Sequence, residues 1–168
     1  DELLGDSVVP REPPSDEELV EILRRQWFAV VPTGTLEAKD DREHIAQLSL
    51  PSRIVYLAAT SQVPILVLGS TQTAAAHFVE QFGIGMVVDY NRRRFQEAVA
   101  SITRPDVNLG YRQRALAVAG RFIADGAADW IWSSLAQGKP IDQRYEDLMP
   151  AGTPCVPQPP TDTALSGG

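Results

Sequence analysis

The chain has 168 residues and 43% of them are apolar, so there is room for about one domain and most of the chain is expected to fold. Its net charge of -7 excludes general binding to nucleic acids or anionic membranes, which requires a basic surface, but a nucleotide ligand needs only a few local donors. No apolar run approaches the roughly 20 residues that span a membrane. The single cysteine, Cys155, favours a reducing compartment. We therefore expect a cytoplasmic protein with no transmembrane segment, or one associated with a membrane through its parent protein.

The N-terminal part of the chain predicts a strand, a helix and a second strand. Residues 7–9 have the character of the end of a short strand. Ser15 and Glu18 have the spacing of a capping box, which predicts the start of a helix. The apolar run 27–31 is typical of a buried strand, and it ends in the polar turn 32–35.

The middle of the chain predicts two further helix–strand pairs. Residues 36–48 are charged and helix-permissive. Pro51 suits the first turn of a helix that runs to about residue 60, and the apolar run 65–68 follows as a buried strand. A second helix, from about residue 71 to Gly83, leads to a strand at 86–88.

The C-terminal part predicts three helices and a tail. The first helix is stopped by Pro105, the second ends near Gly126, and the third begins at an Asp129 cap and ends at Gly138. Residues 149–168 are rich in proline and glycine and have no periodic pattern, so they are expected to be flexible.

Short buried strands that alternate with helices predict an α/β fold: a Rossmann-like parallel sheet of about four strands flanked by helices, within one domain at 1–148. Ligands of such sheets bind beyond the carboxyl ends of the strands. In this chain those ends are residues 32–35, 69–71 and 89–91, and each is polar and turn-forming.

Two of the predicted helices begin at polar turns that suit a diphosphate. Ser49 to Arg53 opens one helix, and Gly69-Ser70-Thr71 opens the next. Each helix N-terminus offers unpaired N–H groups and about half a positive charge, and Arg53 would add a cation. The alternative for Arg53 is a surface ion pair with Asp41 or Glu43. We interpret the two turns as half of a nucleotide-sugar site.

The order of these parts resembles the C-terminal nucleotide-sugar-binding domain of glycosyltransferases with the GT-B fold, over roughly residues 7–135. The matching segments are Pro32-Thr33 after a buried strand, Ser49-Leu-Pro-Ser-Arg53 before Tyr56-Leu-Ala-Ala59, Pro64-Ile-Leu-Val67, and Phe78 to Val88 with its Gly83-Ile-Gly85. The resemblance implies transfer of a sugar from a nucleotide diphosphate to an unidentified acceptor. It implies neither a bound metal nor another cofactor.

By position, the resemblance also implies a set of donor-binding residues, while the catalytic residues stay unknown. The donor and its diphosphate would be held by Thr33, Gly34, Thr35, Ser49, Ser52, Arg53, Gly69, Ser70, Thr71 and Thr73. Many retaining members carry two glutamates eight positions apart, and the matching positions here are Gln47 and Val55. Glu37 is the other candidate for the donor-side role. The stereochemistry of transfer therefore stays open, as do the sugar and base of the donor.

A complete domain of this kind has about six strands, against the four predicted here. Strands one and two would be missing, and the acceptor-binding N-terminal domain would belong to the same chain or to a partner chain. We therefore expect a C-terminal piece of a longer enzyme, with an exposed sheet edge where strand one belongs. Alone, it is expected to bind nucleotide weakly and to catalyse nothing.

Two other functions remain open: a non-catalytic α/β module that binds a nucleotide or a partner, and a sugar-nucleotide epimerase of related fold. The basic cluster at residues 91–94 is most simply a solvated helix face, with contact to phosphate or anionic lipid as its alternative. His44 and His77 have no zinc-like spacing, and no metal site is expected.

Overall fold

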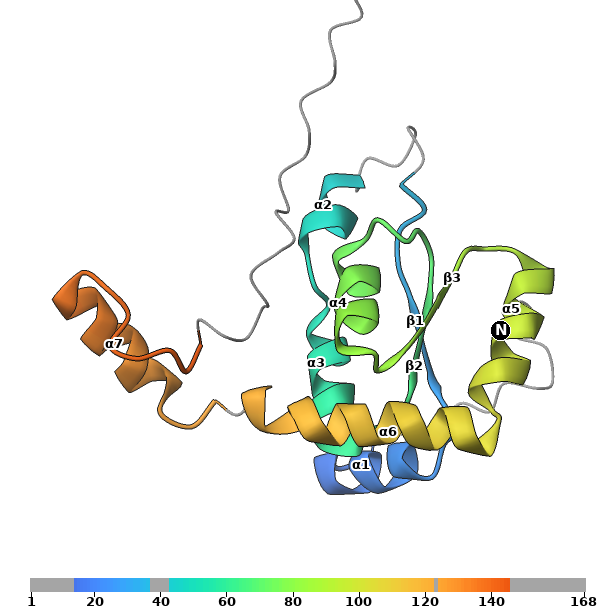
Figure 1. Cartoon of the computed structure of the whole chain (residues 1–168), viewed down its shortest axis with the longest axis horizontal. Helices are drawn as coiled ribbons and strands as arrows, with labels where there is room; N and C mark the ends of the chain where they lie inside the picture. The colour runs from blue at the N-terminus through green and yellow to red at the C-terminus, as the bar shows by residue number, and fades with distance from the viewer. Residues whose placement is uncertain (1–13, 37–42, 123, 146–168) are drawn as a thin grey trace, which may run out of the picture. The chain divides into compact units, whose positions relative to one another are not determined.

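The computed structural model describes residues 14–36, 43–122 and 124–145, which form two compact units that divide after residue 123. The first unit is an α/β structure in which helices flank a parallel sheet of three strands, as Figure 1 shows. Its elements in chain order are α1 (Asp16–Arg24), β1 (Ala29–Pro32), α2 (Glu43–Leu48), α3 (Ser52–Tyr56), the π-helix η1 (Leu57–Ser61), β2 (Ile65–Leu68), α4 (Ala74–Phe82), β3 (Gly85–Val88), α5 (Arg92–Ile102), α6 (Pro105–Ala119) and the 3₁₀-helix η2 (Gly120–Phe122).

The sheet confirms the predicted α/β class with parallel strands. Its order is β1-β2-β3, with Ala29 of β1 opposite Ile65 of β2, and Ile65 opposite Gly85 of β3. The described residues form three strands, where four were predicted. The fourth candidate, at residues 7–9, lies outside the described residues. The observed sheet therefore agrees with a Rossmann-like architecture in class and direction but contains one strand fewer.

Helices cover both faces of the central strand, so the core has two halves. On one face, α3, η1 and α4 pack over the sheet, and α5 packs over the other face (Figure 1). The long helix α6 crosses the N-terminal ends of the strands and contributes to both halves. Because side chains alternate along a strand, β2 sends Ile65 and Val67 to the first half and Leu66 to the second, and all three are fully buried.

Several predicted helix boundaries were wrong by a few residues, for local reasons. Helix α4 begins at Ala74, not near residue 71, because Thr73 caps it: its hydroxyl accepts a hydrogen bond from the N–H of Ala76 at 3.2 Å. The helix predicted over 51–60 exists, but it changes to a π-helix at Leu57. At the start of α1 the predicted capping box is confirmed, with Ser15 and Glu18 bonded in both directions at 3.0 and 3.3 Å.

Strand β1 is the edge of the described sheet and is less buried than its apolar sequence predicts. Val30 is 42% exposed and Trp27, just before the strand, is 54% exposed. The reason is that, among the described helices of this face, α5 packs over β2 and β3, which leaves Val30 of β1 exposed. Ala29 donates to the carbonyl of Pro64, just before β2, and Thr33 donates to the carbonyl of Leu68 in β2, so the alternation along the strand leaves Pro32 facing outward. Pro32 has no N–H, and its carbonyl accepts a bond from Nη2 of Arg53 at 3.1 Å, so this end of the edge is blunted against further pairing.

The second unit contains α7 (Ala127–Gln137), which starts after Gly126 rather than at the predicted Asp129 cap. Gly126 adopts a φ of 75°, and Asp129 lies in the first turn instead, where the helix dipole favours a carboxylate. The indole of Trp130 donates to Asp142 at 2.9 Å. The pKa of Asp142 is lowered mainly by the backbone N–H of Arg144 and also by this indole.

No helix among the described residues is long and apolar enough to cross a bilayer.

One buried polar residue, Asn108 of α6, joins three segments of the first unit. Its amide donates to the carbonyls of Trp27 and Ile102, at 2.6 and 3.0 Å, and its oxygen accepts a bond from Nε of Arg112 at 3.0 Å. Arg112 also donates to the carbonyl of Gln26. Partial burial lowers the pKa of the Arg112 guanidinium. Asn108 therefore fixes α6 to the end of α5 and to the entry of β1.

We predict that Asn108→Ala lowers the free energy of unfolding by about 2–3 kcal/mol, because it removes three hydrogen bonds and leaves two carbonyls without this donor. Urea denaturation would measure the change. Gln113→Ala, an exposed change on the same helix, should alter stability by less than about 0.5 kcal/mol. Equal midpoints for the two variants would show that the network contributes nothing.

Candidate functional site

Three polar turns meet at the carboxyl edge of the sheet and are bonded to one another. They are residues 33–35 after β1, 69–71 after β2 and 89–91 after β3. The N–H of Ser70 donates to the carbonyl of Gly34 at 3.2 Å, and the N–H of Gly69 donates to Val88 at 2.8 Å. The Tyr90 hydroxyl donates to the carbonyl of Thr33 at 2.8 Å and so links the turns of the two outer strands. The predicted ligand-facing rim is therefore a connected structure.

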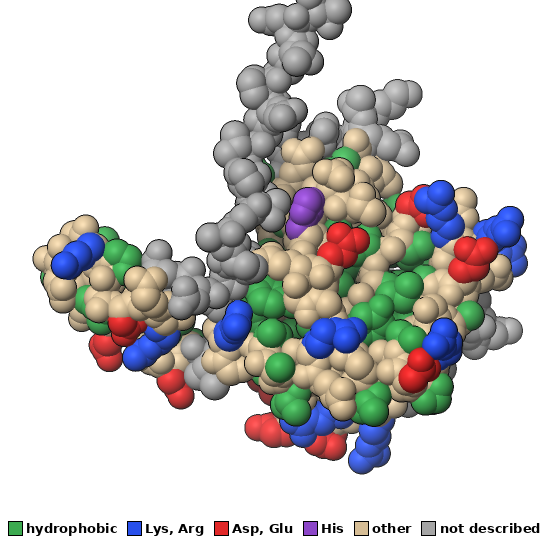
Figure 2. All heavy atoms as spheres, in the orientation of Figure 1, with side chains coloured by type: hydrophobic (Ala, Val, Ile, Leu, Met, Phe, Trp, Pro, Cys, Tyr) green, Lys and Arg blue, Asp and Glu red, His purple; other side chains and the backbone are tan. Residues whose placement is uncertain are grey.

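A cavity of about 760 Å³ opens beside the second and third turns, within the range of roughly 300–1,000 Å³ that is common for ligand pockets. Three consecutive residues of β3 line the cavity. Because consecutive side chains of a strand point to opposite faces of the sheet, a cavity lined by all three lies along the edge of β3 that does not pair with β2. Figure 2 shows hydrophobic side chains between α4 and α5, with acidic and basic side chains beside them. The lining residues are Thr35, Gly69, Ser70, Thr71, Met86, Val87, Val88, Asp89, Tyr90, Asn91, Arg94, Glu97 and Ala98.

Gly69 is required by the close approach of the first two turns. A Cβ atom on Gly69 would lie 2.0 Å from Oγ1 of Thr33 and 3.0 Å from the carbonyl oxygen of Gly34. Its φ of 154° is one that residues with a side chain rarely adopt. The predicted Gly-Ser-Thr turn therefore lies against the turn after β1 because its first residue has no side chain.

The predicted hydroxyl groups divide into those used by the fold and those that are free. Thr73 is buried, and its hydroxyl donates to the carbonyl of Ser70 at 3.0 Å in addition to capping α4. Thr33 donates its hydroxyl to the carbonyl of Leu68 at 3.3 Å, and Ser70 accepts from a neighbouring N–H. Thr35 and Thr71 are exposed, line the cavity and make no hydrogen bond within the described part of the chain. These two threonines are the hydroxyls best placed for a ligand.

The turn at 49–53 lies next to this rim but outside the cavity. Arg53 is exposed, and its bond to Pro32 holds the start of α3 against the end of β1. Ser49 and Ser52 are exposed, and neither is among the residues described as lining the cavity. The structure thus brings Arg53 to the first turn, whereas the cavity forms around the second and third turns.

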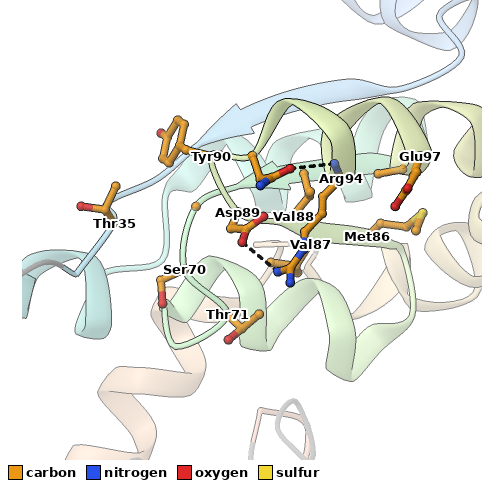
Figure 3. A pocket seen from close by; sticks show the side chains of 13 residues that line it. Thr35, Ser70, Thr71, Met86, Val87, Val88, Asp89, Tyr90, Arg94 and Glu97 are labelled. Carbon is orange, nitrogen blue, oxygen red and sulfur yellow. Dashed lines mark hydrogen bonds and ion pairs between the residues drawn. The ribbon is translucent and has the colours of Figure 1, made fainter.

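Sequence reasoning placed no residue of helix α5 in the site and kept phosphate contact by the cluster 91–94 only as an alternative. Asp89 and Arg94 form an ion pair of 2.8 Å in the cavity (Figure 3), and Arg93 pairs with Glu97 at 3.0 Å. Asn91 caps the helix by accepting from the N–H of Arg94 at 3.1 Å. The basic cluster at 91–94 carried the signal: Arg93 is solvated, with 88% of its side chain exposed, but Arg94 lines the cavity. Only the cap geometry tells the two arginines apart.

We predict that Gly69→Ala destabilises the first unit by about 1–3 kcal/mol or more, because the added methyl group overlaps Thr33. Thermal and urea unfolding would measure the loss. A second change, Thr33→Ala, should restore part of it by removing the overlapping Oγ1. Gly120→Ala is the control: φ there is -61°, and apart from its chain neighbours and its own helix backbone an added Cβ would meet no atom of the described residues within 4 Å, so stability should stay the same or rise by about 0.5–1 kcal/mol. If Gly120→Ala lowered the free energy of unfolding as much as Gly69→Ala, the loss could not be attributed to the close approach of the two turns.

Comparisons with protein families, with curated proteins and with solved structures gave no match to this chain. Within the described residues, no group of three or more His, Cys, Asp or Glu side chains could hold a metal ion. Among the described residues, the site combines a rim of three joined turns, two threonine hydroxyls without a hydrogen-bond partner, and a cavity lined by one arginine and two carboxylates.

Proposed function

We propose that this chain is the donor-binding part of a glycosyltransferase and that it binds a nucleotide-diphosphate sugar at the carboxyl edge of its sheet. The observation that carries the proposal is the meeting of the turns after β1, β2 and β3 beside one cavity. Ligands of parallel α/β sheets bind at this edge. The resemblance of the segment order to the donor domain of GT-B glycosyltransferases gives the class of ligand.

The diphosphate of the donor would lie over the turn 69–71. Gly69 and Thr71 line the cavity, and the Thr71 hydroxyl makes no hydrogen bond among the described residues, so it can donate to a phosphate oxygen. The N-terminus of α4 lies just beyond and contributes a positive potential. In the transfer reaction, the bond between the sugar and the diphosphate breaks, and these fixed donors stabilise the charge that develops on the leaving diphosphate.

The acceptor would be bound by a second domain that packs over the same edge. The described sheet ends at β1 on one side and at β3 on the other. No residue of the described part of the chain has an assigned role as the catalytic base. Within this proposal, the present chain holds the donor, and the other domain supplies the acceptor pocket and completes the catalytic site.

The first test is calorimetric titration of the chain with UDP and GDP. We expect weak binding, weakened further by about 1.5–3 kcal/mol in Arg53→Ala if the diphosphate reaches this guanidinium from the adjacent rim. Arg25→Ala is the matched control: Arg25 is an exposed arginine at the end of α1, and its side chain has no partner among the described residues. It should leave the affinity unchanged.

Absence of binding to either nucleotide, by chain whose folding is verified by circular dichroism, would count against the proposal. Binding of UDP or GDP, without sugar transfer when the acceptor domain is supplied, would favour a non-catalytic nucleotide-binding module. Product analysis with and without an acceptor separates transfer from epimerisation, because only transfer consumes the acceptor.

A further inference from the structure

Arg94 is the one cation among the described residues that line the cavity, and its present partner is a carboxylate of the same rim. Nη1 of Arg94 lies 2.8 Å from Oδ2 of Asp89, the first residue after β3. Figure 3 shows the guanidinium reaching past Asp89 toward the turn that carries Ser70 and Thr71. The arginine thus faces the turn at which the proposed function places the diphosphate, from the opposite side of the cavity.

The ion pair between Arg94 and Asp89 is one that a ligand phosphate can replace. The two side chains are 68% and 49% exposed, and ion pairs of that exposure contribute little to stability, because water screens the charges. A phosphate group offers a guanidinium more acceptor oxygens and more negative charge than one carboxylate does. In the absence of ligand, Asp89 holds the guanidinium inside the cavity and balances its charge.

We propose that Arg94 binds a phosphate group of the nucleotide and that Asp89 is a placeholder, released from the guanidinium when the ligand enters. This inference rests on the proposed function and adds a residue and a switching contact to it. The charges around Arg94 make the idea testable: among the described residues that line the cavity, Asp89 and Glu97 are acidic and Arg94 is basic, while Arg93 outside the cavity balances Glu97. Asp89 therefore competes with an incoming phosphate for the guanidinium, and its negative charge opposes binding.

The neighbouring arginine provides an internal comparison. Arg93 is on the same turn of α5 and carries the same charge, but it pairs with Glu97 at 3.0 Å and is not among the residues described as lining the cavity. A long-range electrostatic effect would depend on both arginines about equally. Direct binding depends on Arg94 alone.

The experiment titrates the whole chain with UDP and with inorganic pyrophosphate, in four forms: unchanged, Arg94→Gln, Asp89→Asn and Arg93→Gln. We expect Arg94→Gln to weaken binding of both probes roughly tenfold or more, and Asp89→Asn to tighten it about three- to tenfold. Arg93→Gln should stay within about twofold of the unchanged chain. Far-ultraviolet circular dichroism verifies that each variant keeps its helices.

Equal losses in Arg94→Gln and Arg93→Gln would overturn the inference, as would an unchanged or weaker affinity in Asp89→Asn. If UDP binds and the affinity responds to Arg53→Ala but not to Arg94→Gln, the inference fails and the proposed function stands. If neither UDP nor pyrophosphate binds to the unchanged chain or to Asp89→Asn, the proposed function fails together with the inference.

Discussion

The structure of the first unit depends on strand β2. Each of its residues pairs with a neighbour on both sides, in register with Ala29 to Pro32 and with Gly85 to Val88. Helices cover both of its faces, and its first three residues are fully buried. Because all three strands are parallel, the same pairing that buries the core brings three loops to one edge. Burial of a four-residue apolar segment and assembly of the candidate site are therefore consequences of one register.

Much of this fold could be predicted from local patterns. The apolar run at 65–68 was predicted to be a buried strand and is one, since a strand with two neighbours and two covered faces has no polar positions. The run at 27–31 has the same apolar character but lies at the edge of the described sheet, where Val30 is exposed. Composition cannot separate the two cases, because a strand's neighbours are set by the whole sheet and not by its own residues.

The candidate site was predicted in part, and the reason is geometric. The turn at 69–71 could be identified because a glycine between a strand and a helix cap is a local signal. The contribution of Arg94 could not, because Arg92, Arg93 and Arg94 are equivalent until the cap at Asn91 fixes the phase of the helix. The role of Arg53 also needed the fold. Its contact with Pro32 joins residues 21 positions apart and shields a strand edge, which no spacing along the chain indicates.

The bond between the Tyr90 hydroxyl and the carbonyl of Thr33 spans 57 positions of the chain and joins the loops after β1 and β3, while Ser70 joins the loop between them to Gly34. Loops held in this way have already lost much of their conformational entropy during folding. A ligand that enters such a rim loses its own freedom on binding but has less backbone to order. The cross-bracing of these loops is thus a form of preorganisation, in which part of the entropic cost of recognition is met when the sheet forms.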